Sequence, residues 1–98
     1  MPSTTPAPMT AAGERPRLAR HVRLSFDPAR GRHVLLTPEA VTVLNGTGAA
    51  VIGLCDGTRT VAEIVAALRG RYDRVDDDEV RRFLGRLAGK RYLEVGRG

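Results

Sequence analysis

The chain has 98 residues with one cysteine, no tryptophan, two tyrosines, two phenylalanines and a formal net charge of +5. This length suits a single domain and excludes a two-domain enzyme, and no apolar run approaches the ~20 residues of a membrane-spanning helix. One cysteine forms no internal disulfide, and no Cys/His cluster has the spacing of a structural zinc site. The basic excess comes from arginines spread along the chain, which favours a solvated surface over a nucleic-acid footprint.

The N-terminal segment is expected to be disordered. Residues 1–16 hold four of the six prolines and almost no large apolar side chain, so they cannot offset the entropy of ordering. They also lack the basic and apolar regions of a secretory signal, which predicts a cytoplasmic location. The folded domain is placed at residues 17–95, with residues 96–98 as a flexible C-terminus. Removal of residues 1–15 is therefore expected to leave stability unchanged.

Three strands are predicted in the first half of the domain. Residues 18–26 alternate between apolar and polar side chains, as a half-buried strand does. The Pro and Gly of residues 27–31 predict a turn into a second strand at residues 33–36, and the two strands form a hairpin. Residues 41–44, of which the first three are β-branched, predict a short third strand. Such a small sheet needs a helical layer over its apolar face.

A first, short helix follows the third strand. Asn45 or Thr47 can cap its start, and its apolar positions reach Cys55 at helical spacing. Gly57 is expected to end this helix as a left-handed C-cap.

Two further helices carry stronger signals. Thr60 and Glu63 have the spacing of a capping box in front of an apolar stripe. Asp76 or Asp77 caps the third helix, whose acidic first turn suits the positive end of the helix dipole. Residues 92–95 form an extended ending. Segregated strands and helices indicate an α+β fold, in outline a winged helix-turn-helix with a three-stranded antiparallel sheet packed on three helices.

The sequence offers little for catalysis or metal binding, so neither an enzyme nor a cofactor is expected. Cys55 falls on the apolar side of its helix, where a buried thiol behaves as a small hydrophobe. His21 and His33 are expected to be solvated, and two histidines alone make a poor metal site. The acidic residues 76–79 lack the spacing and glycine of an EF-hand, and helix capping accounts for them.

Two kinds of binding module remain. A winged-helix protein binds DNA through the start of its recognition helix, but here the acidic residues 76–79 would repel phosphate. The other kind binds a peptide that adds as a strand at residues 41–44 and lies along the third helix. The arginines of that helix would favour an acidic peptide. The same edge can instead be covered by a partner chain, and both a monomer and a dimer remain open.

One stretch of the sequence is a specific motif, L-C-D-G-x-R-T-V-x-E-I at residues 54–64. Residues 34–39, 43–45, 71–73 and 93–95 contribute further motifs around it. Together, and in this order, they resemble the PqqD family of pyrroloquinoline quinone (PQQ) biosynthesis, and the resemblance covers roughly residues 18–95.

The resemblance implies a non-catalytic peptide chaperone, the stand-alone form of the recognition element found for ribosomally made, modified peptides. Such a protein binds the precursor peptide PqqA and presents it to PqqE, a radical S-adenosylmethionine enzyme, and neither nucleic acid nor a membrane is an expected partner. In this recognition fold the leader peptide adds to the third strand and packs along the third helix. The implied peptide-binding residues are Val41, Thr42, Val43, Leu44, Arg81, Arg82, Gly85, Arg86 and Ala88.

Overall fold

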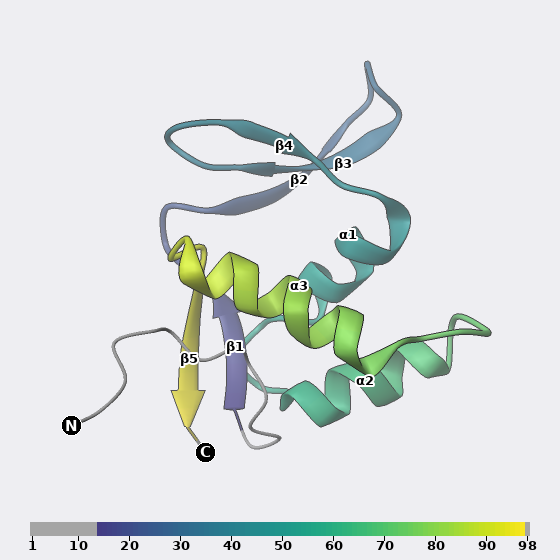
Figure 1. Cartoon of the computed structure of the whole chain (residues 1–98). Coiled ribbons are helices and arrows are strands. Elements are labelled where there is room, and N and C mark those ends of the chain that lie inside the picture. Colours follow the sequence, from purple (N-terminus) through teal and green to yellow (C-terminus); the bar gives the residue numbers. More distant parts are fainter. Residues whose placement is uncertain (1–13, 98) are drawn as a thin grey trace.

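The structure is a computed structural model that describes residues 14–97. In that range the strands β1 (Glu14–Leu18), β2 (Arg23–Asp27), β3 (Arg32–Leu36) and β4 (Val41–Val43) precede the helices α1 (Gly46–Gly53), α2 (Val61–Arg69) and α3 (Asp77–Gly89), and β5 (Leu93–Arg97) follows (Figure 1). Strands and helices are segregated, as an α+β fold requires. The strands, however, form two sheets instead of the one that was predicted.

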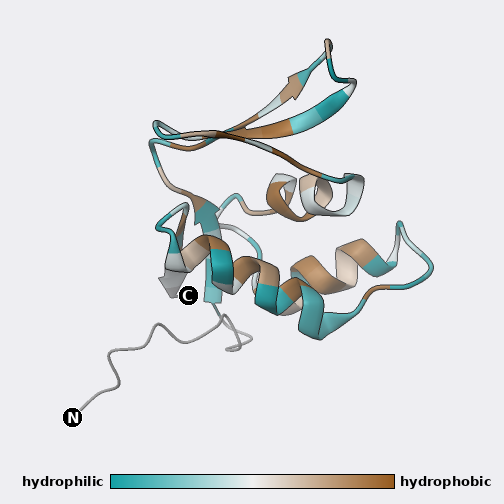
Figure 2. Cartoon of the chain, turned by 45° about the horizontal axis from the view of Figure 1, so that its top comes forward, coloured by the Kyte–Doolittle hydropathy of each residue, from teal (hydrophilic) through white to brown (hydrophobic). Residues whose placement is uncertain are grey.

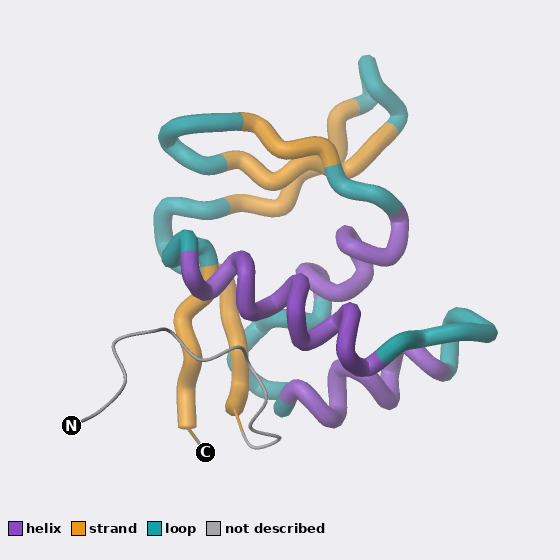
Figure 3. The backbone as a smooth tube through the Cα atoms, in the orientation of Figure 1, coloured by secondary structure: helices purple, strands orange, loops and turns teal. Residues whose placement is uncertain are grey.

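The larger sheet is antiparallel, with the strand order β2-β3-β4. Its register places Val43 opposite Val34 and Thr42 opposite Leu35. The predicted hairpin of the first two strands is confirmed as β2 and β3. Figure 3 shows α1 directly below this sheet, and α1 contacts both β2 and β3.

The single strand predicted at residues 18–26 is broken in the structure. β1 ends at Leu18 and β2 begins at Arg23, with a turn between them in which the Val22 N–H donates to the Ala19 carbonyl at 3.1 Å. Ala19 and Val22 are both buried, three residues apart. That spacing brings them together across a turn, whereas a continuous strand would place them on opposite faces.

The folded domain extends beyond its predicted bounds at both ends, because the smaller sheet begins at residue 14 in β1 and ends at residue 97 in β5. β1 pairs antiparallel with β5 from Glu14 opposite Arg97 to Leu18 opposite Leu93. Residues 14–16, expected to be disordered, and residues 96–97, expected to be flexible, are therefore paired in strands, and Pro16 is fully buried. The rest of those two predictions concerns residues 1–13 and 98, which lie outside the described range. A proline-rich composition does not exclude an edge strand, because only one side of such a strand needs its N–H groups.

The helices begin at the predicted capping residues. Asn45 caps α1 and accepts a hydrogen bond from the Gly48 N–H at 2.6 Å. Thr60 and Glu63 form the predicted capping box of α2, and Asp76 caps α3. Alternating hydrophobic and hydrophilic bands run along α3 in Figure 2, as expected for a helix with one apolar face. These signals are local, so they could be predicted correctly.

The end of α1 differs from the prediction. The helix stops at Gly53 with Leu54 as its C-cap, so Cys55 lies beyond the helix. Gly57 has the expected positive φ, of 84°, but its N–H donates to the Pro16 carbonyl at 3.0 Å. This glycine therefore joins the loop after α1 to β1, and it does not cap the helix.

The core lies between the sheets and the helices. Its largest fully buried aliphatic side chains come from β3 and from all three helices: Leu35, Ile52, Ile64, Leu68 and Leu84. The two-stranded sheet closes the other end of this core, where β1 contacts α2 and β5 contacts α3.

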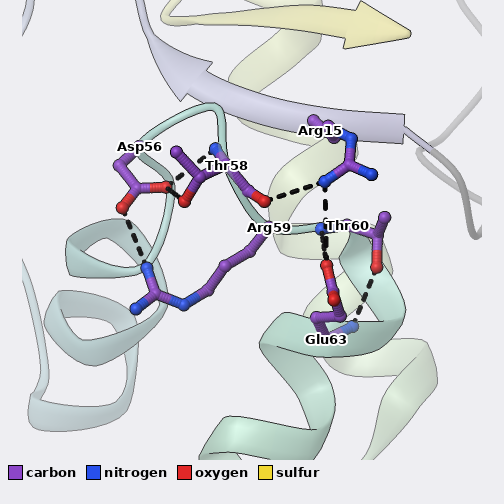
Figure 4. A network of polar contacts seen from close by, with 6 residues as sticks. All are labelled: Arg15, Asp56, Thr58, Arg59, Thr60 and Glu63. Carbon is purple, nitrogen blue, oxygen red and sulfur yellow. Dashed lines mark hydrogen bonds and ion pairs between the residues drawn. The ribbon is translucent and has the colours of Figure 1, made fainter. Parts of the chain in front are cut away.

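The motif at residues 54–64 forms a polar network that connects the loop before α2 to β1 (Figure 4). Asp56 accepts hydrogen bonds from the Thr58 hydroxyl at 2.5 Å and the Thr58 N–H at 2.9 Å, and pairs with Arg59 at 2.9 Å. Arg15 donates to the Thr58 carbonyl at 2.8 Å and lies 3.9 Å from the Glu63 carboxylate. The most specific stretch of the sequence therefore contributes to the fold.

This network predicts a loss of stability in acid. Hydrogen bonds from Thr58, together with the charge of Arg59, lower the pKa of Asp56 below its ordinary value of 3.8. Because the folded pKa lies below the unfolded one, this stabilisation is complete above the unfolded value and is lost as the pH falls through the folded value. We expect the melting temperature, followed by circular dichroism, to fall below about pH 4. Asp56→Asn should melt lower at neutral pH and show a shallower acid decline, and parallel curves would contradict this role.

Candidate functional site

The outer edge of β4 is open. Among residues 14–97, no strand pairs with the side of β4 that faces away from β3. The Leu44 N–H donates to the His33 carbonyl at 3.0 Å, which shows that the backbone groups of Leu44 face β3. Backbone direction alternates along an antiparallel strand, so the N–H and C=O groups of Val41 and Val43 face outward. These groups can bond to an added strand.

A groove of about 480 Å³ lies beside this edge, between the end of β4, the start of α1 and one face of α3. Figure 1 shows β4 above α3, with the two elements running in roughly opposite directions. The groove is lined by Val43, Asn45, Thr47, Gly48, Val51, Arg74, Val75, Asp76, Glu79, Val80, Arg82, Phe83 and Arg86.

The floor of the groove is apolar and centres on Phe83. Val80 is buried and Phe83 is half-buried. A Cβ atom added at Gly48 would lie 3.5 Å from Phe83 Cζ and 3.1 Å from Asn45 Oδ1, so the glycine allows α1 to approach the ring closely. Arg86 carries its guanidinium 5.9 Å from the centre of the Phe83 ring, within the range of a cation–π contact. The floor can thus take an apolar side chain next to a fixed cation.

The structure brings part of the predicted site to this groove. Val43, Arg82 and Arg86 line it, and they come from segments about forty residues apart in the sequence. Val41 and Thr42 belong to the same edge strand, and all three residues of the strand are exposed. The exposed fraction is 54% for Val41 and 40% for Val43. Exposed valines on an unpaired edge are unusual in a monomer and mark a surface that another chain can cover.

The other predicted residues do not line the groove. Leu44 is buried in the core, because residues of the strand alternate and its side chain faces inward. Arg81 lies one position away on α3, with its side chain 21% exposed and 3.9 Å from the Asp77 carboxylate. Gly85 and Ala88 are half-buried outside the lining. The face of α3 that lines the groove is thus rotated by about one residue from the predicted set.

Two sets of groove residues were missed by the sequence reasoning. The start of α1 contributes Thr47, Gly48 and Val51, and no local pattern connects it with α3. On α3, Glu79 and Phe83 share a face with Arg82 and Arg86 at helical spacing. That spacing is visible in the sequence, but Glu79 and Phe83 are not among the residues predicted to bind the peptide.

Neither the cysteine nor the histidines line the groove. Cys55 lies in the core, where its thiol donates to the Val51 carbonyl at 3.2 Å and burial raises its pKa to about 12. A thiol that stays protonated is a weak nucleophile. His33 is exposed and packs its ring edge-to-face on Phe26 at 5.1 Å. Within the described part of the chain, no three His, Cys, Asp or Glu residues gather as metal ligands, and no helix is both long and apolar enough to cross a membrane.

Comparison with known proteins shows which family has this sequence and fold. The family model described as Coenzyme PQQ synthesis protein D (PqqD) matches residues 32–93, which include β4, all three helices and the groove. The chain belongs to the PqqD family. The resemblance noted at residues 54–64 and elsewhere is thereby confirmed.

Individual relatives support the same assignment. The PqqA binding protein of Azotobacter vinelandii is 39% identical over 88 residues, which cover 88% of this chain and 96% of that protein. The bifunctional coenzyme PQQ synthesis protein C/D of Methylorubrum extorquens is 41% identical over 96 residues, which cover 94% of this chain but 26% of that protein. The PqqD module also occurs, therefore, as part of a longer chain.

A solved structure supports the fold. It is the solution NMR structure of the PqqD truncation of Methylobacterium extorquens PqqCD, described as a functional and stand-alone recognition element for ribosomally synthesized and post-translationally modified peptides. It matches with a TM-score of 0.67 and 43% identity, covering 81% of this chain and 87% of that chain. The predicted α+β class is confirmed by this match.

Proposed function

We propose that this chain binds the precursor peptide PqqA by strand addition at β4 and presents it to the radical enzyme PqqE, without catalysing a reaction itself. The observation that carries the proposal is the open edge of β4 beside the groove on α3. The names of the relatives support the choice of peptide, and the resemblance supports PqqE as the recipient and the cytoplasm as the location.

The geometry suits an extended peptide. The outward N–H and C=O groups of Val41 and Val43 supply main-chain hydrogen bonds, which give affinity with little dependence on sequence. Selectivity then comes from side chains that reach the groove. Arg82 and Arg86 line it with their charged groups exposed and favour carboxylates through charge-assisted hydrogen bonds.

Presentation follows from the same geometry. A peptide held as an added strand has lost most of its conformational freedom before it meets the enzyme, so the enzyme pays less ordering entropy when it binds. The chaperone needs no reactive group for this role. It needs only a second surface, away from β4, that the enzyme can contact while the peptide stays bound.

Amide chemical shifts test the proposal. Titration of the ¹⁵N-labelled chain with PqqA should shift the amides of residues 41–44 and of α3 residues 79–86, and duplex DNA should leave them unchanged, because the acidic start of α3 repels phosphate. Addition of PqqE to the loaded chain should perturb a different surface. Shifts at α3 with DNA would favour a winged-helix DNA-binding protein, and PqqA shifts confined to the other edge strand, β2, would refute the assigned groove.

A further inference from the structure

We infer that the groove reads the order of charges along the bound peptide: it selects an extended segment with a basic side chain, then an apolar one, then an acidic one, running antiparallel to β4. This inference rests on the proposed strand addition and specifies what the groove would recognise. It assigns a direction and a spacing to the ligand, which the strand edge alone does not do.

The two ends of the groove carry different charges. Asp76 and Glu79 line the end at the start of α3, with Arg74 as the one basic residue beside them. Arg82 and Arg86 line the end further along the helix, and both acidic residues of the lining precede them in the sequence. The first end is therefore weakly negative and the second clearly positive.

These charges are available to a ligand. In the described range, neither Glu79 nor Arg82 forms an ion pair, and both are exposed. Asp76 is held in place by accepting hydrogen bonds from the N–H groups of Asp78 at 2.9 Å and Glu79 at 3.3 Å. Arg86 is held over Phe83. The outermost charges of the groove therefore have preset positions, which lowers the entropy lost on binding.

The direction of the peptide follows from the sheet. All three strands of the β2-β3-β4 sheet are antiparallel, and antiparallel pairing is slightly more stable per residue than parallel pairing. Because β4 and α3 run in roughly opposite directions, a strand antiparallel to β4 runs the same way as α3 (Figure 1). The N-terminal part of the peptide then lies at Asp76 and Glu79, and its C-terminal part lies at Arg82 and Arg86.

The spacing follows from the rise of a helix and of a strand. Along α3, Glu79 and Arg86 are about 10 Å apart and Asp76 and Arg86 about 15 Å. Two residues four apart in an extended peptide are separated by about 13 Å, and both point to the same face. The residue midway between them faces the apolar floor at Phe83 and Val80. The expected pattern is thus basic-x-apolar-x-acidic. These three peptide side chains point to the same side of the extended sheet as the side chain of Leu44.

Two synthetic peptides of identical composition test the charge order. The first is acetyl-Thr-Lys-Thr-Val-Thr-Glu-Thr-amide, and the second exchanges its Lys and Glu. Dissociation constants come from amide shifts of the full chain. We expect the first peptide to bind about fivefold more tightly at about 20 mM salt, and this ratio to shrink at about 300 mM salt as the charges are screened.

A charge exchange in the protein should invert the preference. The variant Glu79→Arg with Arg86→Glu makes the first end of the groove net positive and the second end neutral, and should therefore favour the second peptide. Its control is Asp78→Arg with Lys90→Glu, two exposed residues outside the lining, in the first turn of α3 and at its C-cap, which should keep the original preference.

The outcomes separate this inference from the proposed function. Equal affinities, with shifts still at residues 41–44, would overturn the charge order and leave strand addition standing. Tighter binding of the second peptide by the unmodified chain would overturn the antiparallel direction. No shift with either peptide would overturn the inference, and the titration with PqqA then decides whether strand addition itself survives.

Discussion

Val43→Pro is expected to abolish peptide binding while the domain stays folded. The Val43 N–H faces away from β3, so proline removes a donor that the β3–β4 ladder does not use. An added strand loses that hydrogen bond and also meets the proline ring at the edge. We expect calorimetry with PqqA to show at least a tenfold loss of affinity, because one lost bond and a steric clash together exceed about 1.4 kcal/mol.

Two control variants locate the effect at the edge. Val43→Ala keeps the N–H and should retain most of the affinity, whereas Thr42→Pro removes an N–H directed at β3 and should lower the melting temperature. Circular dichroism of Val43→Pro should match the unmodified chain. An unchanged dissociation constant in a folded Val43→Pro variant would show that the peptide binds elsewhere.

Removal of residues 1–18 is expected to destabilise the domain strongly. It deletes β1 and with it the buried Pro16, the main-chain pairing with β5 and the bond from the Gly57 N–H to the Pro16 carbonyl. It also uncovers Leu93, which is 5% exposed in the intact chain. Because apolar burial and hydrogen bonds are lost, we expect the free energy of unfolding to fall by about 3 kcal/mol or more. This corresponds to a decrease in Tm of more than about 10 °C.

The matched truncation removes residues 1–12 and leaves every described contact of β1 in place. It should melt close to the full chain, and the difference between the two truncations measures the contribution of the strand itself. If both truncations melt alike, β1 contributes nothing to stability and the smaller sheet is incidental. This expectation replaces the one drawn from composition, in which deletion of residues 1–15 had no effect.

The sequence-based predictions succeeded where the interaction is local. The caps at Asn45, Thr60 and Asp76 satisfy backbone groups within three residues, so their patterns are complete in a short window. The turn between β2 and β3 is local for the same reason. The pairing of β1 with β5 joins residues almost eighty positions apart, such as Arg17 and Glu94, and no short window contains it.

The site divides in the same way. Periodicity and the family resemblance predicted that an edge strand at residues 41–44 and the face of the third helix would bind a peptide, and both elements exist. The start of α1 forms one wall of the groove, and it approaches the Phe83 ring of α3 closely at Gly48. A shift of one residue around α3 removed Arg81 from the lining and added Phe83.

The starts of the three helices, the β2–β3 hairpin and the family of this protein follow from the amino-acid sequence alone, because those features are encoded by neighbouring residues and by matching motifs. The pairing of β1 with β5 in a second sheet, and the position of α1 beside the groove next to β4, are seen in the folded structure alone. Both depend on contacts between segments that are distant in the sequence. Such segments pair because together they bury the apolar core, and no single segment carries enough information to predict the pairing.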